Sequence, residues 1–368
     1  MKKHQELSLP ERLLLGPGPS NVPERVLRAL AQPLIGHLDP AFLSLLDEIQ
    51  AMLRRLFRTR DALTLPVSGT GSAGMETCLV NLIEPGDTVL VAVQGVFGER
   101  MLSIVERANG RALRIEAEMG EVIPEERFIE AIRSHTPQVV ALVHAETSTG
   151  VRQPVSAISH AAREVGSLVV LDCVTSLSGM DVRFDDWAID AAYSGTQKCL
   201  SCPPGLSPIA FGPRALERLE RRRRPVQSWY LDLSLIGRYF GEERVYHHTA
   251  PVSMIYALYA ALGLVLEEGL DARFERHRRA HERLVKGLES LGFQMLVHPD
   301  HRLPMLNAVI PPFDDEASVR HRLLTSYGIE VGSGLGKLAG RIWRVGLMGE
   351  NARTEIVDRF LEAVRALS

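Results

Sequence analysis

Apolar runs of strand length alternate with helix-length segments through the first two thirds of the chain. We predict β-strands at Ala62–Val67, Val89–Val93, Ala112–Ala117, Val139–His144, Leu168–Cys173, Ala191–Ser194 and Pro208–Gly212. Helical patterns fall between several of them, at Ser72–Leu82, Phe97–Ala108, Glu125–Ser134 and Val155–Val165. This alternation predicts an α/β fold in which a mostly parallel sheet lies between helices.

The pattern changes after Pro251, where long helical segments precede shorter strands. The predicted elements are helices at Ser253–Glu268 and Ala272–Leu291, strands at Leu306–Ile310, Ile329–Val331 and Ile342–Val345, and a helix at Ala352–Leu367. They indicate a second, smaller α+β domain. We therefore divide the chain into an N-terminal arm (1–20), a large domain (21–250) and a small C-terminal domain (251–368).

Composition narrows the class of protein. The chain has 368 residues, of which 45% are apolar, and its formal net charge of −3 favours neither nucleic acid nor an anionic membrane as a partner. The isolated basic run Arg221–Arg224 is typical of a solvated helix end. We find no apolar run near the ~20 residues of a membrane span and no signal peptide. We therefore expect a cytoplasmic protein.

Metal and redox sites are not favoured. Cys199 and Cys202 form a C-x-x-C pair, but the sequence offers no further ligands beside them, so reduced thiols are expected. His247 and His248 are adjacent, and neighbours on an extended strand point to opposite faces. Because no third ligand is apparent, we expect no metal.

The segment Ser68–Gly74 follows a predicted strand and opens a predicted helix. Free backbone N–H groups and the helix dipole favour a phosphate at such a place. Gly69, Gly71 and Gly74 also match G-x-G-x-x-G, but a dinucleotide site needs an acid after the next strand. Gln94 stands there instead. A single phosphate is favoured, and an NAD(P)-dependent oxidoreductase is the weaker alternative.

Asp172 and Lys198 point to a cofactor. Asp172 ends a buried strand at the edge where α/β proteins bind ligands, although it could simply cap a following helix. Lys198 follows the uncharged run Tyr193–Gln197, and an amine held among neutral groups has a lowered pKa. Pyridoxal phosphate (PLP) needs an amine that forms an imine and an acid that keeps its ring nitrogen protonated. The pair predicts PLP.

Arg341 and Arg344 lie on a segment that reads as a strand, 341–346, and alternation places them on opposite faces, so one of the two arginines can face inward. A guanidinium there can grip a substrate α-carboxylate through two parallel hydrogen bonds. An ion pair between the domains is the structural alternative.

Together these segments resemble the class V aminotransferases of PLP fold type I, most closely their alanine–glyoxylate / serine–pyruvate branch. The resemblance covers nearly the whole chain. It is carried, in order, by Leu15–Asn21, Ser68–Gly71, Glu146–Val151, Asp172, Tyr193–Lys198, Trp229–Asp232, Tyr246–Thr249 and Arg344–Leu347.

The resemblance implies a role for each matching residue. Lys198 would carry the cofactor and move the substrate proton, Asp172 would pair with the ring nitrogen, and Arg344 would hold the substrate carboxylate. The other implied cofactor contacts are Thr70, Gly71, Ser72, Phe97, Thr147, Ser176 and Gln197, with Tyr246 and Thr249 supplied by the other subunit of a homodimer. Phe97 replaces the usual stacking Trp, and Ser72 replaces a His of the closest relatives.

The implied reaction is a ping-pong transfer of an amino group from alanine or serine to glyoxylate or pyruvate. A ureidoglycine–glyoxylate or a pyridoxamine–pyruvate transaminase is the nearest alternative. A PLP lyase or cysteine desulfurase of the same fold would need a reactive cysteine on a loop of the small domain, yet no cysteine follows Cys202. A regulator that only senses PLP would need a DNA-reading module, which we do not find.

Overall fold

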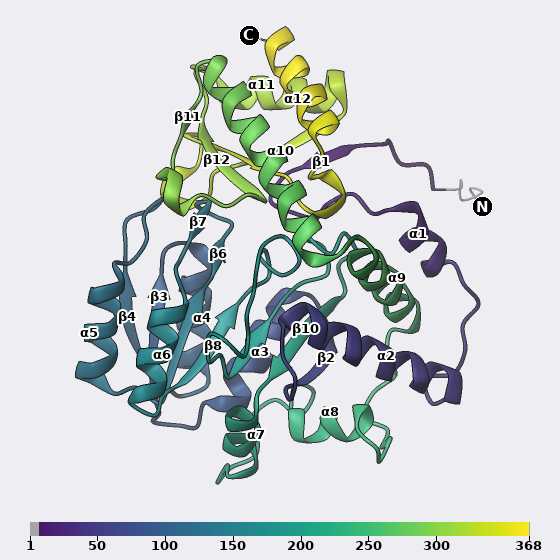
Figure 1. The fold of residues 1–368 in the computed structure, drawn as a ribbon, viewed down its shortest axis with the longest axis vertical. Helices are drawn as coiled ribbons and strands as arrows, with labels where there is room; N and C mark the ends of the chain where they lie inside the picture. Colours follow the sequence, from purple (N-terminus) through teal and green to yellow (C-terminus); the bar gives the residue numbers. More distant parts are fainter. Residues whose placement is uncertain (1–6, 368) are drawn as a thin grey trace, which may run out of the picture.

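A computed structural model describes residues 7–367 of the chain. Figure 1 shows a large part built around a central sheet and a smaller part above it. The central sheet has seven strands in the order β2-β10-β9-β8-β5-β3-β4. Their bounds are Leu63–Ser68 (β2), Thr88–Val93 (β3), Arg111–Glu116 (β4), Val139–Val143 (β5), Leu168–Asp172 (β8), Ala191–Tyr193 (β9) and Leu206–Phe211 (β10).

Strand β10 is antiparallel to both of its neighbours, β2 and β9. All the other strand pairs of this sheet are parallel. The predicted α/β fold with a mostly parallel sheet is therefore confirmed. Parallel strands place their carboxyl ends at one edge. Ser68, Val143 and Asp172 consequently end their strands on the same side of the large domain.

Helices cover the sheet as the periodicity predicts. The four predicted helices are present as Gly71–Leu82 (α3), Val96–Arg107 (α4), Glu125–His135 (α5) and Ser156–Glu164 (α6). The large part also contains Glu24–Leu30 (α1), Pro40–Phe57 (α2), Pro213–Glu220 (α7) and Leu233–Phe240 (α8), which we did not predict. Helix α2 buries an apolar stripe that includes Phe42, Leu46 and Leu53. Asp39 is its N-cap, and Pro40 is its first helical residue.

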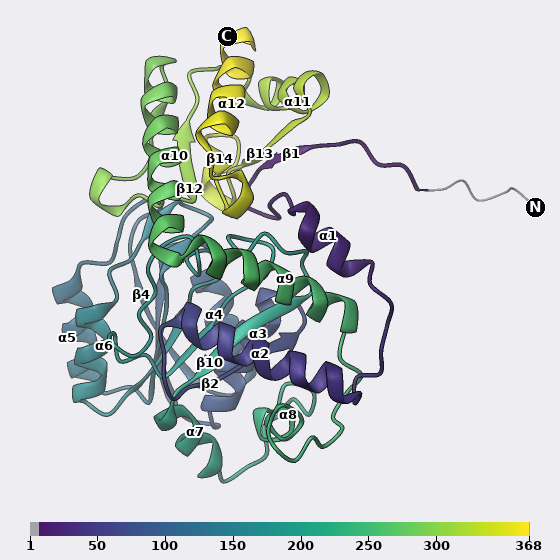
Figure 2. The ribbon, with the colours of Figure 1, turned by 45° about the vertical axis from the view of Figure 1, so that its right-hand side comes forward.

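The smaller part has its own five-stranded sheet, in the order β1-β13-β14-β12-β11. Its strands are Leu13–Leu15 (β1), Gln294–Met295 (β11), Leu306–Ile310 (β12), Ile329–Ser333 (β13) and Trp343–Gly346 (β14). Its helices are Leu270–Ser290 (α10), Glu316–Tyr327 (α11) and Thr354–Leu367 (α12). Strand β1 pairs in parallel with β13, so the beginning of the chain is part of the C-terminal sheet (Figure 2).

The two hydrophobic cores divide the chain at a different place from the predicted boundary. The prediction assigns Val252–Glu268 (α9) to the small domain, whereas its side chains Ile255, Leu258 and Val265 pack in the large core. The small core takes its helical residues from Ala280 onward and also includes Leu15. Helix α9 joins the large core because it packs against α1 and α2.

Between residues 7 and 367 no single helix is long and apolar enough to cross a membrane. Helices α9 and α10 reach the required length and hydropathy only as a pair, and the chain bends by 86° between them.

Candidate active site

A cavity of about 520 Å³, its open mouth included, lies at the carboxyl edge of the central sheet. It brings together side chains that are far apart in the sequence, from α3, α4, the end of β8 and the loop after β9. Eight of the predicted site residues line it: Thr70, Gly71, Ser72, Phe97, Thr147, Asp172, Gln197 and Lys198.

The predicted phosphate loop has the geometry that an anion requires. Thr70 is the N-cap of α3, and its side chain makes no capping hydrogen bond. The first backbone N–H groups of the helix therefore remain available. A Cβ on Gly69 would lie 2.6 Å from that of Ala73, and Gly69 adopts φ of +141°. The Oε1 atom of Gln197, beside this loop, is buried without a hydrogen-bond partner among the described residues.

Asp172 lies at the end of β8 and is almost fully buried. Its Oδ1 accepts a 2.8 Å hydrogen bond from the backbone N–H of Val174, and its Oδ2 accepts one of 2.7 Å from the hydroxyl of Tyr193. No helix follows, so Asp172 caps only a turn. Burial raises its pKa to about 7, against the lowering effect of both hydrogen bonds.

A second carboxyl group, Glu146, is buried beside the cavity. Its oxygens accept hydrogen bonds from the backbone N–H groups of Ser148 (3.0 Å) and Phe97 (3.3 Å), which fixes the start of α4. Burial raises the pKa of Glu146. A Cβ on Gly95 would lie 2.6 Å from the carboxyl carbon, so only glycine leaves room for this group.

Lys198 is buried at the other wall of the cavity. Burial, followed by the nearby Arg344 charge among the lowering causes, brings the pKa of its amine down to about 8. The amine donates a hydrogen bond to the carbonyl of Pro17 in the N-terminal arm. Ser20, also in the arm, donates a 2.9 Å hydrogen bond to the carbonyl of Lys198. The arm therefore contacts both the side chain and the backbone of this lysine.

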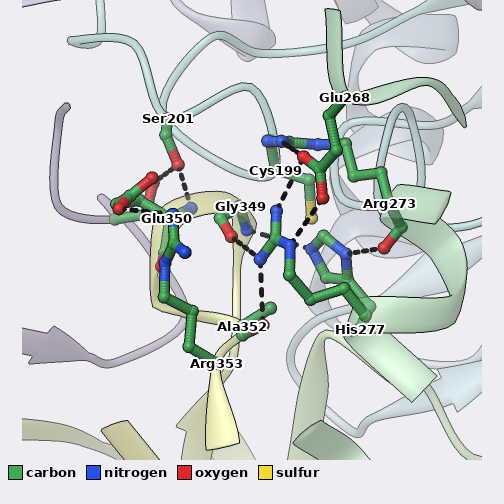
Figure 3. A network of polar contacts seen from close by, with 11 residues as sticks. Cys199, Ser201, Glu268, Arg273, His277, Gly349, Glu350, Ala352 and Arg353 are labelled. Atoms are coloured by element: carbon green, nitrogen blue, oxygen red, sulfur yellow. Dashed lines mark hydrogen bonds and ion pairs between the residues drawn. The ribbon is translucent and has the colours of Figure 1, made fainter. Parts of the chain in front are cut away.

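The segment after Lys198 is held by a polar network that joins the two cores (Figure 3). Arg273 donates to the carbonyl of Cys199 at 2.6 Å and to Glu268 at 2.6 Å. Arg276 contacts Glu268 as well and donates to the carbonyls of Gly349 and Ala352. The segment that follows Lys198, called the lysine loop below, is thus connected to the small domain through α10.

His277 completes this network. Its Nδ1 lies 2.8 Å from the carbonyl of Arg273, and its Nε2 accepts a 3.0 Å hydrogen bond from the N–H of Gly349. These partners select the neutral ring with the proton on Nδ1. Burial, then the Arg273 charge, lowers the pKa of His277 to about 3.

Arg344, on β14, contacts Thr147, a residue that lines the cavity. Its Nε donates to the carbonyl of Ser333 at 2.7 Å, and its Nη1 donates to the carbonyl of Thr147 at 3.3 Å. No carboxylate within ion-pair distance is found for Arg344 among the described residues. The remaining N–H groups of its buried guanidinium can therefore bind an anion.

Four predicted residues are not among those that line the cavity: Arg344, Ser176, Tyr246 and Thr249. Ser176 is buried and its Oγ has no partner in the described part of the chain, but the neighbouring Thr175 lines the cavity instead. Tyr246 and Thr249 are exposed on the surface of the same chain. Their predicted role across a subunit interface is not tested by a single chain.

The paired histidines do not point apart as the extended-chain argument predicts. The Nδ1 atoms of His247 and His248 lie 2.8 Å apart, and Nε2 of His248 lies 2.7 Å from Oγ of Ser68. They differ from the prediction because residues 246–249 form no strand. Within residues 7–367 no cluster of three or more potential ligands could hold a metal.

The four cysteines are buried and free. Burial raises the pKa of Cys199 to about 11 and that of Cys202 to about 12. Both are protonated at neutral pH and poorly reactive.

Sequence reasoning missed Arg100 at the cavity. Its guanidinium lies 5.0 Å from the ring centroid of Phe97, and Nη1 donates a 2.8 Å hydrogen bond to Oγ of Ser72. The i, i+3 spacing of Phe97 and Arg100 on one helix was the available signal. From the sequence, Glu146 was named only as part of a family motif and Tyr193 only as an uncharged neighbour of Lys198, and neither of them was given a role in the site.

Comparison with known proteins agrees with this geometry. The family model described as aminotransferase class-V matches residues 12–355. An (S)-ureidoglycine–glyoxylate transaminase of Bacillus subtilis is 40% identical over 100% of this chain and 93% of its own length. An alanine–glyoxylate aminotransferase of Oryctolagus cuniculus is 40% identical over 98% of this chain and 93% of its own.

A solved structure gives the same result. The alanine–glyoxylate aminotransferase of Nostoc sp. is 48% identical, superposes with a TM-score of 0.97, and covers 99% of this chain and 97% of its own. The chain belongs to the class V aminotransferase family and has the PLP fold type I architecture.

Proposed function

We propose that this aminotransferase uses PLP to transfer the amino group of a small amino acid, alanine or serine, to glyoxylate or pyruvate. The observation that carries the proposal is the single cavity that contains the amine of Lys198, the carboxylate of Asp172 and the open N-terminus of α3. A ureidoglycine donor is the second candidate, because the Bacillus subtilis relative is named for it.

The residues present fit PLP. The available N–H groups at Gly71 and Ser72 suit its phosphate, and the unpartnered Oε1 of Gln197 lies beside them. Phe97 offers an aromatic face on which a pyridinium ring can stack, and Asp172 offers an acceptor for the N–H at the edge of that ring. When bound, the cofactor supplies an aldehyde that condenses with amino groups and a ring that takes up electrons from Cα.

The chain's own residues then have separate tasks. Lys198 holds the cofactor before substrate arrives, and its lowered pKa gives the released amine a larger neutral fraction than an ordinary lysine has, which enables it to remove a proton from Cα. Asp172 in its ionised form keeps the ring nitrogen protonated. Arg344 orients the substrate through its carboxylate, and its two backbone partners hold the guanidinium plane.

We infer a homodimer in which Tyr246 and Thr249 serve the partner's cofactor. Large apolar side chains are unusually exposed on this face: Leu34 (70%), Trp229 (63%) and Tyr246 (58%). The rings of His37 and Tyr246 lie 5.4 Å apart and join the loop after α1 to this segment. Light scattering of the purified protein should give the mass of two chains, and a monomer at micromolar concentration would refute the interface. A cytoplasmic location, expected from the sequence, remains part of the proposal.

The activity is tested with purified protein and defined substrates. L-alanine and glyoxylate together should yield pyruvate and glycine, and neither alone should turn over. Lys198→Ala should lose the covalently held, borohydride-sensitive cofactor and at least about a thousandfold in rate. Lys337→Ala, which removes an exposed lysine, is the matched control. Stoichiometric NAD or zinc in place of PLP would refute the proposal.

A donor screen separates the candidate reactions. Alanine, serine, (S)-ureidoglycine and pyridoxamine are each offered with glyoxylate, pyruvate and 2-oxoglutarate, and kcat/KM is compared. A preference of at least about tenfold for ureidoglycine would favour the second candidate, since differences of one functional group in a pocket are worth about that much.

A further inference from the structure

Tyr193 makes a direct hydrogen bond to the carboxylate that the proposed function assigns to the cofactor ring. It ends β9, next to β8, and Tyr193 and Asp172 are paired in the register of these two strands. Its side chain is fully buried, and its hydroxyl lies 2.7 Å from Oδ2 of Asp172. No other hydrogen bond of this hydroxyl is found in the described chain.

The direction of this hydrogen bond is fixed. Burial, then the Asp172 charge, raises the pKa of Tyr193 well above its usual value, so the phenol keeps its proton and donates. The side chain is fully enclosed, and α3 packs against β9 at this point. A Cβ on Gly74 of that helix would lie 3.1 Å from Cβ of Tyr193.

The two donors hold the carboxylate from both sides. Val174 N–H binds Oδ1 and Tyr193 binds Oδ2, which prevents rotation about the Cβ–Cγ bond. Each oxygen of an ionised carboxylate has a second lone-pair direction. Each oxygen of Asp172 therefore keeps one acceptor position, and a donor in the cavity that Asp172 lines can use one of them.

Few groups set the charge of Asp172. Lys198 from the loop favours its ionised form, and Glu146 from the segment after β5 opposes it. Cys78 on α3 and Cys173 at the strand end interact with it as well, and burial keeps both thiols protonated. With one cation set against one anion, the two hydrogen bonds are the main influence that opposes the effect of burial.

We propose that Tyr193 is a positioning residue: its hydroxyl holds the Asp172 carboxylate, in the ionised form, toward the ring nitrogen of the cofactor. The inference rests on the proposed function, since it takes PLP to be the ligand. Tyr193 itself acts only through Asp172.

The test is PLP binding to apoprotein across pH. Affinity depends on ionised Asp172, so it falls as pH drops through the pKa of that group. Tyr193→Phe removes only the hydroxyl and should move the midpoint of this fall upward by about one pH unit. At neutral pH its dissociation constant should be about tenfold higher than that of the natural protein. Most of this loss of affinity should disappear near pH 9, because Asp172 is then ionised in both proteins.

Controls distinguish positioning from packing. Tyr239→Phe removes another buried tyrosine hydroxyl, which donates to the carbonyl of His37 at 2.7 Å, and should not move the midpoint. Asp172→Asn should bind PLP weakly at every pH, and adding Tyr193→Phe to it should change nothing further. A loss of equal size at all pH values in Tyr193→Phe, or no loss, would overturn the inference.

A second measurement covers the case in which Tyr193→Phe does not fold. Replacing the tyrosines by 3-fluorotyrosine makes the phenol a stronger donor without removing it. The midpoint should then move downward, opposite to the phenylalanine variant, and an unchanged or higher midpoint would contradict the inference. If the natural protein binds no PLP at all, the proposed function fails. If it binds PLP but the midpoint is the same with and without the Tyr193 hydroxyl, only this inference fails.

Discussion

Arg273 donates a 2.6 Å hydrogen bond to the backbone carbonyl of Cys199, the residue that follows Lys198. The arginine belongs to the helix that leads into the small domain, and the carbonyl belongs to the loop of the large one. Arg273 is almost fully buried, and its charge is compensated by Glu268 at 2.6 Å. The position of the lysine loop therefore depends on a charge supplied by α10.

Replacing this arginine should damage both stability and cofactor binding. Arg273→Met leaves the Cys199 carbonyl without its buried donor and takes from Glu268 one of its two arginine partners, so we expect a loss of about 3 kcal/mol in unfolding free energy. PLP affinity should fall as well, because the loop is released. Urea unfolding and PLP titration measure the two effects. Arg278→Ala, on the exposed face of the same helix, is the control and should change stability by less than about 0.5 kcal/mol.

Arg344 should govern substrate binding rather than folding. Arg344→Ala removes the guanidinium N–H groups that are not used by Ser333 and Thr147, and we expect KM for the amino acid to rise about 10- to 100-fold. Arg341→Ala, an exposed arginine three residues earlier, should leave KM unchanged. Steady-state kinetics with several donors measures this. An unchanged KM in Arg344→Ala would remove the carboxylate assignment while leaving the cofactor site intact.

His277 should make stability depend on pH. Its pKa in the folded protein, about 3, lies below the usual value of 6.5. The stability that the buried neutral ring contributes is therefore fully present above pH 6.5. As pH falls below that value, the unfolded chain takes up a proton that the folded chain excludes. Stability then declines by about 1.4 kcal/mol per pH unit until pH approaches 3.

The variant His277→Gln should remove this part of the slope. Urea unfolding at several pH values should show lower stability at neutral pH, by about 1 to 3 kcal/mol, but a shallower decline in acid. His144, whose pKa burial also lowers to about 3, should leave a residual slope in both proteins. Identical slopes would show that His277 is not excluded from protonation.

Gly18 should be intolerant of a side chain because of its contact with the lysine. It adopts φ of +107°, and a Cβ there would lie 2.9 Å from Cδ and Nζ of Lys198. Gly18→Ala should displace the amine and reduce kcat by at least about tenfold, with a strain of about 1 kcal/mol in stability. Gly86→Ala shares the positive φ but meets no neighbour within 4 Å, so it should show the stability loss alone. Equal kinetics in the two variants would contradict the proposed contact.

The parallel sheet and the main site residues were predictable because both depend on local signals. Buried parallel strands appear as continuous apolar runs, and ligands lie at their carboxyl ends, so Asp172 and the Gly69–Gly71 turn could be placed together. The uncharged run before Lys198 indicated a buried amine. Its pKa of about 8 agrees with that interpretation.

Features that depend on distant pairing could not be predicted in this way. Strand β1 has only three residues, and its partner β13 begins at Ile329. The contact between Pro17 and Lys198 likewise joins segments with no local pattern in common. The predicted domain boundary at residue 251 put α9 in the small domain, whereas α9 packs in the large core. An apolar helix can pack on either core, and only the tertiary structure decides which one.

The pairing of β1 with β13 also has a consequence for biosynthesis. The ribosome synthesises Leu13–Leu15 before the strands of the large domain, whereas their partner strand Ile329–Ser333 follows those strands in the sequence. Until Ile329–Ser333 has been made, this short segment has no sheet to join. The segment that contacts the lysine is therefore secured in its sheet only after every strand of the large domain has been synthesised.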